Sequence, residues 1–197
     1  MTARIVDTET ESLPSGLSNP TIHITTHNDS GHAKVHSSKQ NPWQFMQSDK
    51  VGFNVVYTTS EFPASLNDQT DIESYEKTMA GGKLGLVQKN GTVCRIVDFA
   101  PDGKPVMHRT QSLDYGIVLE GEIEMELDDG SVTRLKKGDI AVQRGTMHAW
   151  RNTSKTEWTR MIFVLQDCQP LVVGGKRLGE DITQGGPDIP ASGNDTD

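Results

Sequence analysis

Hydrophobic and polar residues alternate along several short stretches in the middle of the chain. The clearest stretch covers residues 122–127, where Ile123, Met125 and Leu127 alternate with three glutamates. Successive side chains of a β-strand point to opposite faces, so this pattern predicts a strand with one buried and one wet face. Turn sequences follow it, "DDG" at 128–130 and "KKGD" at 136–139. Short strands joined by such turns are typical of antiparallel sheets.

The same analysis predicts strands over most of the chain. A hairpin is predicted at 21–36 around a turn at 28–31, and residues 60–90 are predicted to form a long loop that holds one helical turn or a short helix. The remaining predicted strands cover residues 52–59, 91–99, 115–120, 122–127, 131–135, 140–143, 148–152 and 157–165. So many short strands, with no internal repeat, predict an all-β fold with a single sandwich or small barrel.

The two ends of the chain differ from its middle in composition. Residues 1–20 are polar and proline-containing, and residues 179–197 carry five acidic residues and no basic one. Both segments are expected to be disordered, since they offer little apolar surface to bury. Between them we expect N-terminal strands and a long loop over residues 21–90, and a barrel core over residues 91–178.

Charge and composition exclude several classes of partner. The net charge of −8 argues against binding to nucleic acid or to an anionic membrane surface. The longest apolar runs, such as "MIFVL" at 161–165, are too short to cross a bilayer, and no secretory signal is recognised. Cys94 and Cys168 form no disulfide or metal-binding pattern. We therefore expect a soluble, cytoplasmic protein.

The histidines fall into two groups. Four of the six lie in the predicted hairpin at 21–36, with a spacing that matches no closed set of metal ligands. His108 and His148 lie in the strand-rich region, and Thr110 would share a strand face with His108. His108 and His148 are the stronger candidates for chemistry.

Two groups of residues resemble the two motifs of the cupin superfamily. The first cupin motif runs glycine, histidine, any residue, histidine, a few residues, glutamate, six residues and glycine. The matching residues here are Gly103, His108, Thr110, Asp114 and Gly121. The chain departs from the motif where Thr110 replaces the second histidine and Asp114 replaces the glutamate.

The second cupin motif runs glycine, aspartate, an apolar strand, a proline–glycine corner, histidine and, four positions on, asparagine. The matching residues are Gly138, Asp139, Gly145, His148 and Asn152, with Arg144 in the usual proline position. The resemblance implies a single double-stranded β-helix, or jelly-roll, barrel with an N-terminal strand extension. In such a barrel His108, Asp114 and His148 are expected to converge on one pocket.

Three interpretations of this set remain open. His108, Asp114 and His148 are a recognised ligand set for one iron, manganese or zinc ion, although the hydroxyl of Thr110 would be a weak ligand. The same three residues could perform metal-free acid–base catalysis. The third interpretation is a pocket that binds a small molecule without chemistry. No nucleotide cofactor is expected.

Three further residues are candidates for contact with a substrate. Trp150, two positions beyond His148, is a candidate pocket wall, and Thr110 and Arg144 are further candidates for substrate binding, although a structural salt bridge is the favoured role of Arg144. Cupin barrels of this size commonly pair through an outer sheet, so the resemblance implies a homodimer.

A narrower resemblance concerns function. The strings "NGTVCRIVDFAP", "HRTQSLDYGIVLEGEIEMELDDG" and "VQRGTMHAWRN" look like small single-domain cupins of fungi and bacteria. Fungal members accompany polyketide synthases in clusters for salicylaldehyde-type compounds, and such members are often called cupin-domain oxidoreductases. We predict an enzyme that dehydrates, enolises or aromatises a polyketide-type small molecule, with His108 and His148 as base and acid. A metal-dependent oxidoreductase or dioxygenase and a non-catalytic binding module are the alternatives.

Overall fold

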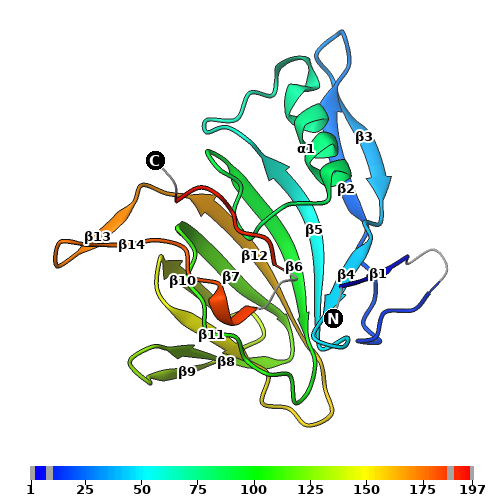
Figure 1. Cartoon of the computed structure of the whole chain (residues 1–197). Coiled ribbons are helices and arrows are strands. Elements are labelled where there is room, and N and C mark those ends of the chain that lie inside the picture. Colours follow the sequence, from blue (N-terminus) through cyan, green and yellow to red (C-terminus); the bar gives the residue numbers. More distant parts are fainter. Residues whose placement is uncertain (1–2, 8–10, 186–188, 196–197) are drawn as a thin grey trace.

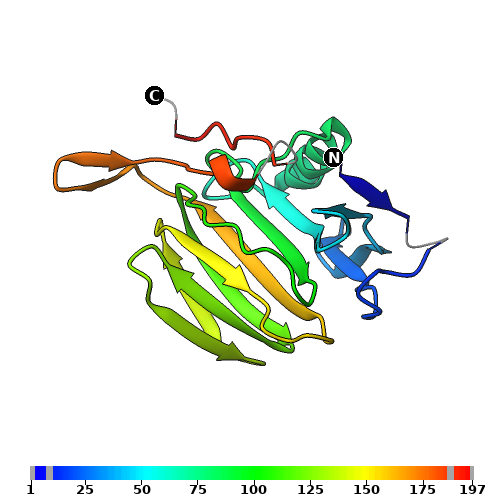
Figure 2. The same ribbon diagram turned by 60° about the horizontal axis from the view of Figure 1, so that its bottom comes forward.

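Two antiparallel sheets of unequal size face each other in the computed structural model, which describes residues 3–7, 11–185 and 189–195 (Figures 1 and 2). The larger sheet has the order β1 (Arg4–Val6), β4 (Trp43–Met46), β5 (Val51–Thr59), β6 (Thr92–Phe99), β12 (Thr159–Asp167), β7 (Ser112–Glu120) and β10 (Ile140–Arg144). The smaller sheet has the order β11 (His148–Arg151), β8 (Glu122–Leu127) and β9 (Val132–Lys136). The expected all-β barrel is confirmed.

Two hairpins, one α-helix and two short 3-10 helices, η1 (Asn67–Gln69) and η2 (Thr183–Gly185), complete the described structure. The hairpins are β2 (Ile22–His27) with β3 (Ala33–Lys39), and β13 (Leu171–Val173) with β14 (Lys176–Leu178). Helix α1 (Thr70–Gly81) lies in the segment expected to be a loop with one short helix. The predicted turn of the first hairpin is held by Asn28, whose Oδ1 accepts hydrogen bonds from the backbone N–H groups of Ser30 and His32. None of the helices in the described ranges has the length and apolar character needed to cross a membrane.

The main hydrophobic core fills the space between the two sheets. Val97 on β6, Met161 on β12 and Ile123 on β8 are each less than 5% exposed and belong to one packed cluster. A second cluster lies on the opposite face of β6, where Ile96 packs with Trp43 and other residues. Strand β6 is therefore buried on both faces, which hides the alternation that marks half-buried strands such as β8.

Some residues within both expected arms contact the barrel. Strand β1 pairs with β4, its Val6 is fully buried, and Leu13 packs in the same cluster. Near the other end, the side-chain nitrogen of Asn194 donates to the backbone oxygen of Gln111 at 2.9 Å. A few apolar or amide side chains anchor each segment, a signal too sparse for composition to detect. Residues 1–2, 8–10, 186–188 and 196–197 of the two expected arms lie outside the described residues.

The larger sheet runs across the boundary expected at residue 91. Strand β5 pairs with β6 from Val51 opposite Phe99 to Thr59 opposite Thr92. The strands of the segment 21–90 therefore extend the sheet of the barrel core, and they bring β5 next to the pocket described below.

The outer face of the larger sheet carries exposed apolar side chains near its β10 edge. Val142 on β10 lies opposite Tyr115 on β7, and the two residues are 54% and 41% exposed. The homodimer implied by the cupin resemblance, with the hairpin at 21–36 and the strand near Val55 as candidates for the pairing, stays a prediction.

A buried ion pair joins the two central strands of the larger sheet. The Nε and one terminal nitrogen of Arg160 on β12 donate to the two carboxylate oxygens of Asp98 on β6 at 2.6 and 2.7 Å. The other terminal nitrogen of Arg160 donates to the backbone oxygen of Ser18 at 2.6 Å, and the guanidinium lies over the ring of Trp43. Arg160 therefore links the N-terminal segment to the barrel.

Gly91, just before β6, is expected to be sensitive to substitution. A Cβ at this position would lie 1.9 Å from the backbone oxygen of Thr59, so the chain must shift to accept alanine. We expect Gly91→Ala to lower the free energy of unfolding by about 1–3 kcal/mol in a urea titration. The control is Gly81→Ala at the end of α1, where a Cβ would meet no atom of another segment within 4 Å and alanine favours the helix. Equal stability of the two variants would contradict this prediction.

Candidate active site

The two candidate histidines are brought together by a backbone bridge. The N–H of His108 donates to the backbone oxygen of His148 at 2.9 Å, and the N–H of His148 returns the bond at 2.9 Å. Such a doubly bonded antiparallel pair fixes the two Cα atoms close to each other. The ring centroids lie 4.5 Å apart at an interplanar angle of 49°. Residues forty positions apart in sequence therefore share one site, as the sequence predicted.

Backbone carbonyls set the tautomer of both imidazoles. Nδ1 of His108 lies 2.9 Å from the oxygen of Val106, and Nδ1 of His148 lies 2.9 Å from the oxygen of Thr146. A carbonyl oxygen only accepts, so each Nδ1 carries the proton. Burial lowers the pKa of both rings, and the neighbouring His108 helps to lower that of His148 to about 3. At neutral pH both rings are uncharged, and each Nε2 presents a lone pair.

Asp114 lies inside β7 in an environment that favours its protonated form. It is only 4% exposed, and desolvation raises the pKa of its carboxyl to about 6. One oxygen, Oδ2, accepts a 3.4 Å hydrogen bond from the hydroxyl of Thr110, which in turn accepts one from Ser112 at 2.8 Å. The other oxygen, Oδ1, is buried and has no hydrogen-bond partner. A carboxyl with a pKa of about 6 can both take and return a proton near neutral pH.

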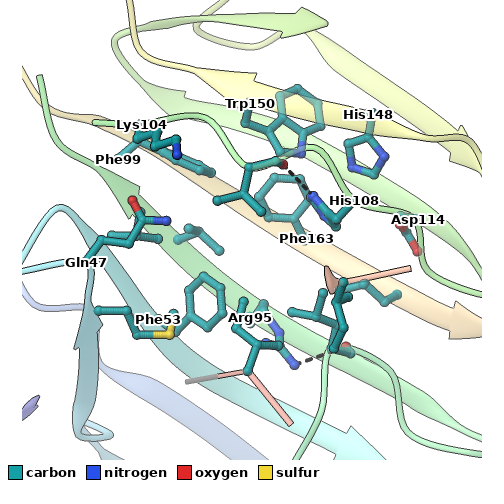
Figure 3. Close-up of a pocket in the computed structure, with 18 residues that line it drawn as sticks. Gln47, Phe53, Arg95, Phe99, Lys104, His108, Asp114, His148, Trp150 and Phe163 are labelled. Atoms are coloured by element: carbon teal, nitrogen blue, oxygen red, sulfur yellow. Dashed lines mark hydrogen bonds between the residues drawn. The ribbon is translucent and has the colours of Figure 1, made fainter. Parts of the chain in front are cut away.

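All three residues line one mostly apolar cavity of about 110 Å³ between the sheets (Figure 3). The polar side chains of its lining are Gln47, Arg95, Lys104, His108, Asp114 and His148. The apolar ones are Met46, Val51, Phe53, Leu86, Val97, Phe99, Val106, Trp150, Phe163, Leu165, Ile182 and Ile189. A few polar groups in an apolar cavity are the usual composition of a small-molecule site.

Of the three residues suggested for substrate binding, only Trp150 lines the described cavity. Trp150 lines the cavity, with its ring edge-on to His148 at 5.6 Å and to Phe163 at 5.4 Å. Thr110 is 2% exposed and is not part of the lining, so its place is behind Asp114 rather than against a ligand. Arg144 is exposed on β10 and lies outside the cavity, because the alternation of that strand turns it outward.

Sequence reasoning missed Arg95, a buried cation in the cavity wall. Arg95, Val97 and Phe99 occupy alternate positions on β6 and all three line the cavity. The available signal was a single charged residue in the middle of an otherwise apolar strand, "TVCRIVDF". Such residues are almost never fully buried unless they are paired or functional.

The residues fit a metal ion less well than the sequence suggested. His108 and His148 offer two Nε2 lone pairs, but the described residues include no group of three or more histidine, cysteine, aspartate or glutamate side chains placed to hold an ion. Metal sites in proteins generally use three or four protein ligands. Asp114 is one methylene shorter than the glutamate of the cupin motif, and Thr110 replaces the third nitrogen ligand. The expected set His108, Asp114 and His148 therefore does not form a three-ligand site here.

Comparison with known proteins places the chain in a family. The family model described as "Cupin domain" matches residues 95–165. "Cupin-domain-containing oxidoreductase fogC" of Aspergillus ruber is 39% identical over 173 residues, which cover 86% of this chain and 83% of the relative. The chain belongs to the cupin family.

Two further relatives of this cupin carry names from fungal biosynthesis. "Phomopsin biosynthesis cluster protein D" of Diaporthe leptostromiformis is 41% identical over 180 residues, which cover 90% of this chain and 94% of the relative. "Oryzines biosynthesis cluster protein J" of Aspergillus oryzae is 37% identical over 166 residues, which cover 83% and 92% of the two chains.

Other motif positions of this cupin have structural roles. Asn152 is buried, and its side-chain nitrogen donates to the backbone oxygens of Phe99 and Glu157. Gly145, at the corner before His148, has a φ of +62°, a conformation that favours glycine. These residues shape the second motif so that His148 reaches the cavity.

The low pKa of His148 predicts a loss of stability in acid. The unfolded ring titrates near 6.5 and the folded ring near 3, so between these pH values only the unfolded chain takes up the proton. The free energy of unfolding contributed by this residue is therefore present above pH 6.5 and falls as the pH falls towards 3. Urea titrations at pH 7 and pH 4.5 should show a larger loss for the natural protein than for His148→Gln. Asp114, whose pKa is raised, acts in the opposite direction and is common to both proteins; equal losses would contradict the prediction.

Proposed function

We propose that this cupin catalyses a proton-transfer reaction on an oxygenated small molecule, by enolisation, dehydration or aromatisation. The observation that carries the proposal is a buried carboxyl with a pKa of about 6, in the same apolar cavity as two neutral imidazoles. The pKa of an efficient general acid or base lies near the working pH, and the Asp114 carboxyl meets this condition.

We assign His108 and His148 roles that differ from the base and acid suggested by the sequence, because the pKa of His148 is low. A ring that resists protonation down to about pH 3 is a weak base, so His148 is better suited to orient the substrate than to remove its proton. The Nε2 atoms of His108 and His148 accept hydrogen bonds from hydroxyl groups of the substrate. Asp114 is the catalytic residue that carries the proton, and Thr110 positions it by donating to Oδ2.

These three residues are sufficient for a dehydration, with Asp114 as the group that takes and returns the proton. The ionised Asp114 takes the proton from the carbon next to a substrate carbonyl, and the C–H electrons form the enolate. The protonated Asp114 then gives the same proton to the β-hydroxyl, which leaves as water while the carbon–carbon double bond forms. In an enolisation, Asp114 returns the proton to the substrate oxygen. The apolar walls exclude bulk water during these steps.

The relatives support the kind of substrate rather than the reaction. Phomopsin and oryzines cluster proteins share at least 37% identity with this chain over most of its length. We infer that the substrate is an intermediate of a fungal secondary metabolite, and that the polyketide-type molecule implied by the cupin resemblance is one such intermediate.

Deuterium exchange into a simple ketone tests the proposal without the natural substrate. The protein is incubated in D₂O with 2-tetralone, an aryl-fused ketone, and loss of the protons next to the carbonyl is followed by NMR. We expect exchange faster than in buffer alone and faster than with an equal amount of heat-denatured protein. Binding of 2-tetralone without faster exchange would overturn the catalytic proposal and support a binding module.

A metal-dependent oxidoreductase is the second candidate. It is favoured by relatives named cupin-domain oxidoreductases, and by the two Nε2 lone pairs that face one cavity. The test is elemental analysis of protein purified without a metal-affinity column. Stoichiometric iron, manganese or zinc that is lost in His108→Ala would place this candidate first, whereas a protein without stoichiometric metal that still exchanges 2-tetralone would support proton transfer.

A further inference from the structure

Arg95 is a deeply buried cation without an anionic partner. Its residue is 4% exposed, and the described part of the chain contains no carboxylate within ion-pair distance of its guanidinium. Arg160, on the neighbouring strand β12, is equally buried but forms a two-point ion pair with Asp98. Burying a charge is costly unless the charge is compensated. Arg95 therefore lacks the compensation that the same sheet gives to Arg160.

The guanidinium of Arg95 is held in a fixed orientation. One terminal nitrogen donates to the backbone oxygens of Gly85 and Leu86 at 2.6 and 3.0 Å, and the guanidinium carbon lies 5.2 Å from the centre of the Phe53 ring. These contacts leave the buried Nε–H without a hydrogen-bond partner. Burial lowers the pKa of Arg95 to about 10, so the group stays charged at neutral pH. A preoriented cation with an unused donor is suited to bind an oxyanion.

The other polar groups of the cavity do not neutralise Arg95. His108 and His148 are uncharged, and Lys104 adds a second cation at an exposed position of the lining. Asp114, with a pKa of about 6, is largely ionised at pH 7 and attracts Arg95 electrostatically, but it is one carboxylate facing the two cations Arg95 and Lys104. The cavity thus carries excess positive charge inside a protein whose net charge is −8.

Arg95 also lies where two cavities meet. A second cavity of about 430 Å³, between the N-terminal strands and α1, shares Arg95, Met46, Phe53 and Ile189 with the first one. A ligand in either cavity could therefore reach the guanidinium. The walls of the first cavity include Phe53, Phe99, Trp150 and Phe163, which suit a flat aromatic ligand (Figure 3).

We infer that the cavity binds an aromatic carboxylate, and that Arg95 is the residue that selects for its negative charge. This inference rests on the proposed function only in taking that anion to be the substrate of the proton-transfer site. The carboxylate accepts a hydrogen bond from the unpaired Nε–H of Arg95. The aromatic ring packs against the apolar walls towards His108 and His148. Asp114 is the one acidic residue among the described residues of the lining, so its proton remains the one that moves.

Paired ligands that differ only in charge test the inference. Benzoate and benzamide have nearly the same shape, and their dissociation constants are measured by ligand-observed NMR at pH 7. We expect the natural protein to bind benzoate about 10- to 100-fold more tightly, the effect of one hydrogen bond to a charged group. Arg95→Met should abolish this preference because it weakens benzoate binding much more than benzamide binding, and Arg95→Lys should keep part of it. Arg144→Met, at an exposed arginine outside the cavity, is the matched control and should behave as the natural protein.

A second variant separates this inference from the proposed function. Asp114→Asn removes a negative charge from the cavity, so it should strengthen benzoate binding while abolishing exchange of 2-tetralone. A benzoate preference without any exchange in the natural protein would support Arg95 and overturn the catalytic proposal. Exchange with equal affinity for benzoate and benzamide would overturn the role of Arg95 alone. A preference that survives in a folded Arg95→Met protein would also overturn it.

Discussion

Replacing Asp114 by asparagine is expected to lower the rate of deuterium exchange into 2-tetralone by about 10²–10⁴, the usual contribution of a general acid or base. The amide has nearly the same shape as the carboxyl and still accepts the hydrogen bond from Thr110, but it cannot take a proton. Burial disfavours the charged carboxylate and raises the pKa of Asp114 to about 6, and the neutral amide avoids this desolvation cost. The protein should therefore stay folded, and thermal melting checks this directly.

The matched control for Asp114→Asn is Asp128→Asn in the exposed turn between β8 and β9. It makes the same chemical change far from the cavity lining and should leave the exchange rate unchanged. If Asp114→Asn retains the rate of the natural protein, another group moves the proton and the role given to Asp114 is wrong. The pH profile adds an independent check, because the rate should rise with pH through about 6 as Asp114 ionises.

The largest effect on stability is expected from Arg160→Met. The variant leaves Asp98, which is fully buried, without its two-point partner, and removes the hydrogen bond to Ser18. Breaking one side of a buried ion pair costs about 3–5 kcal/mol, which should appear as a lower midpoint in urea unfolding. The double variant Asp98→Leu with Arg160→Met removes both charges and should recover most of this loss.

An exposed ion pair provides the comparison for Arg160. Arg134 pairs with Glu122 on the smaller sheet, but the arginine side chain is 60% exposed. Surface pairs contribute only about 0–1 kcal/mol, so Arg134→Met should change the midpoint little. If Arg160→Met and Arg134→Met have similar effects, the buried pair does not stabilise the link between β6 and β12 as the structure indicates.

The features that sequence could predict are those with a local pattern. Ile123, Met125 and Leu127 alternate with glutamates because β8 has one wet face, and that alternation is visible without coordinates. His108 and His148 were found because the two cupin motifs fix their places, and the backbone bridge between them confirms that they meet. Local pattern therefore predicted the barrel and the two imidazoles.

The features that sequence could not predict depend on burial by distant segments. Arg95 lies on a strand covered on both faces, so its neighbours Val93, Ile96 and Val97 give no alternation that points it to the cavity. The tautomers of the histidines depend on carbonyls presented by the folded backbone, and the raised pKa of Asp114 depends on the closure of the cavity. Thr110 was expected beside a ligand, but the fold turns it behind Asp114.

Two walls of the cavity, Ile182 and Ile189, come from the chain that follows the barrel strands. Neither residue belongs to a strand of the two sheets. Changes at these two positions alter the shape of the cavity without touching the contacts that join β6, β7 and β12. Substitutions in the segment after the barrel strands can therefore change which molecules fit the cavity, while the hydrogen-bonded strands of the barrel stay the same.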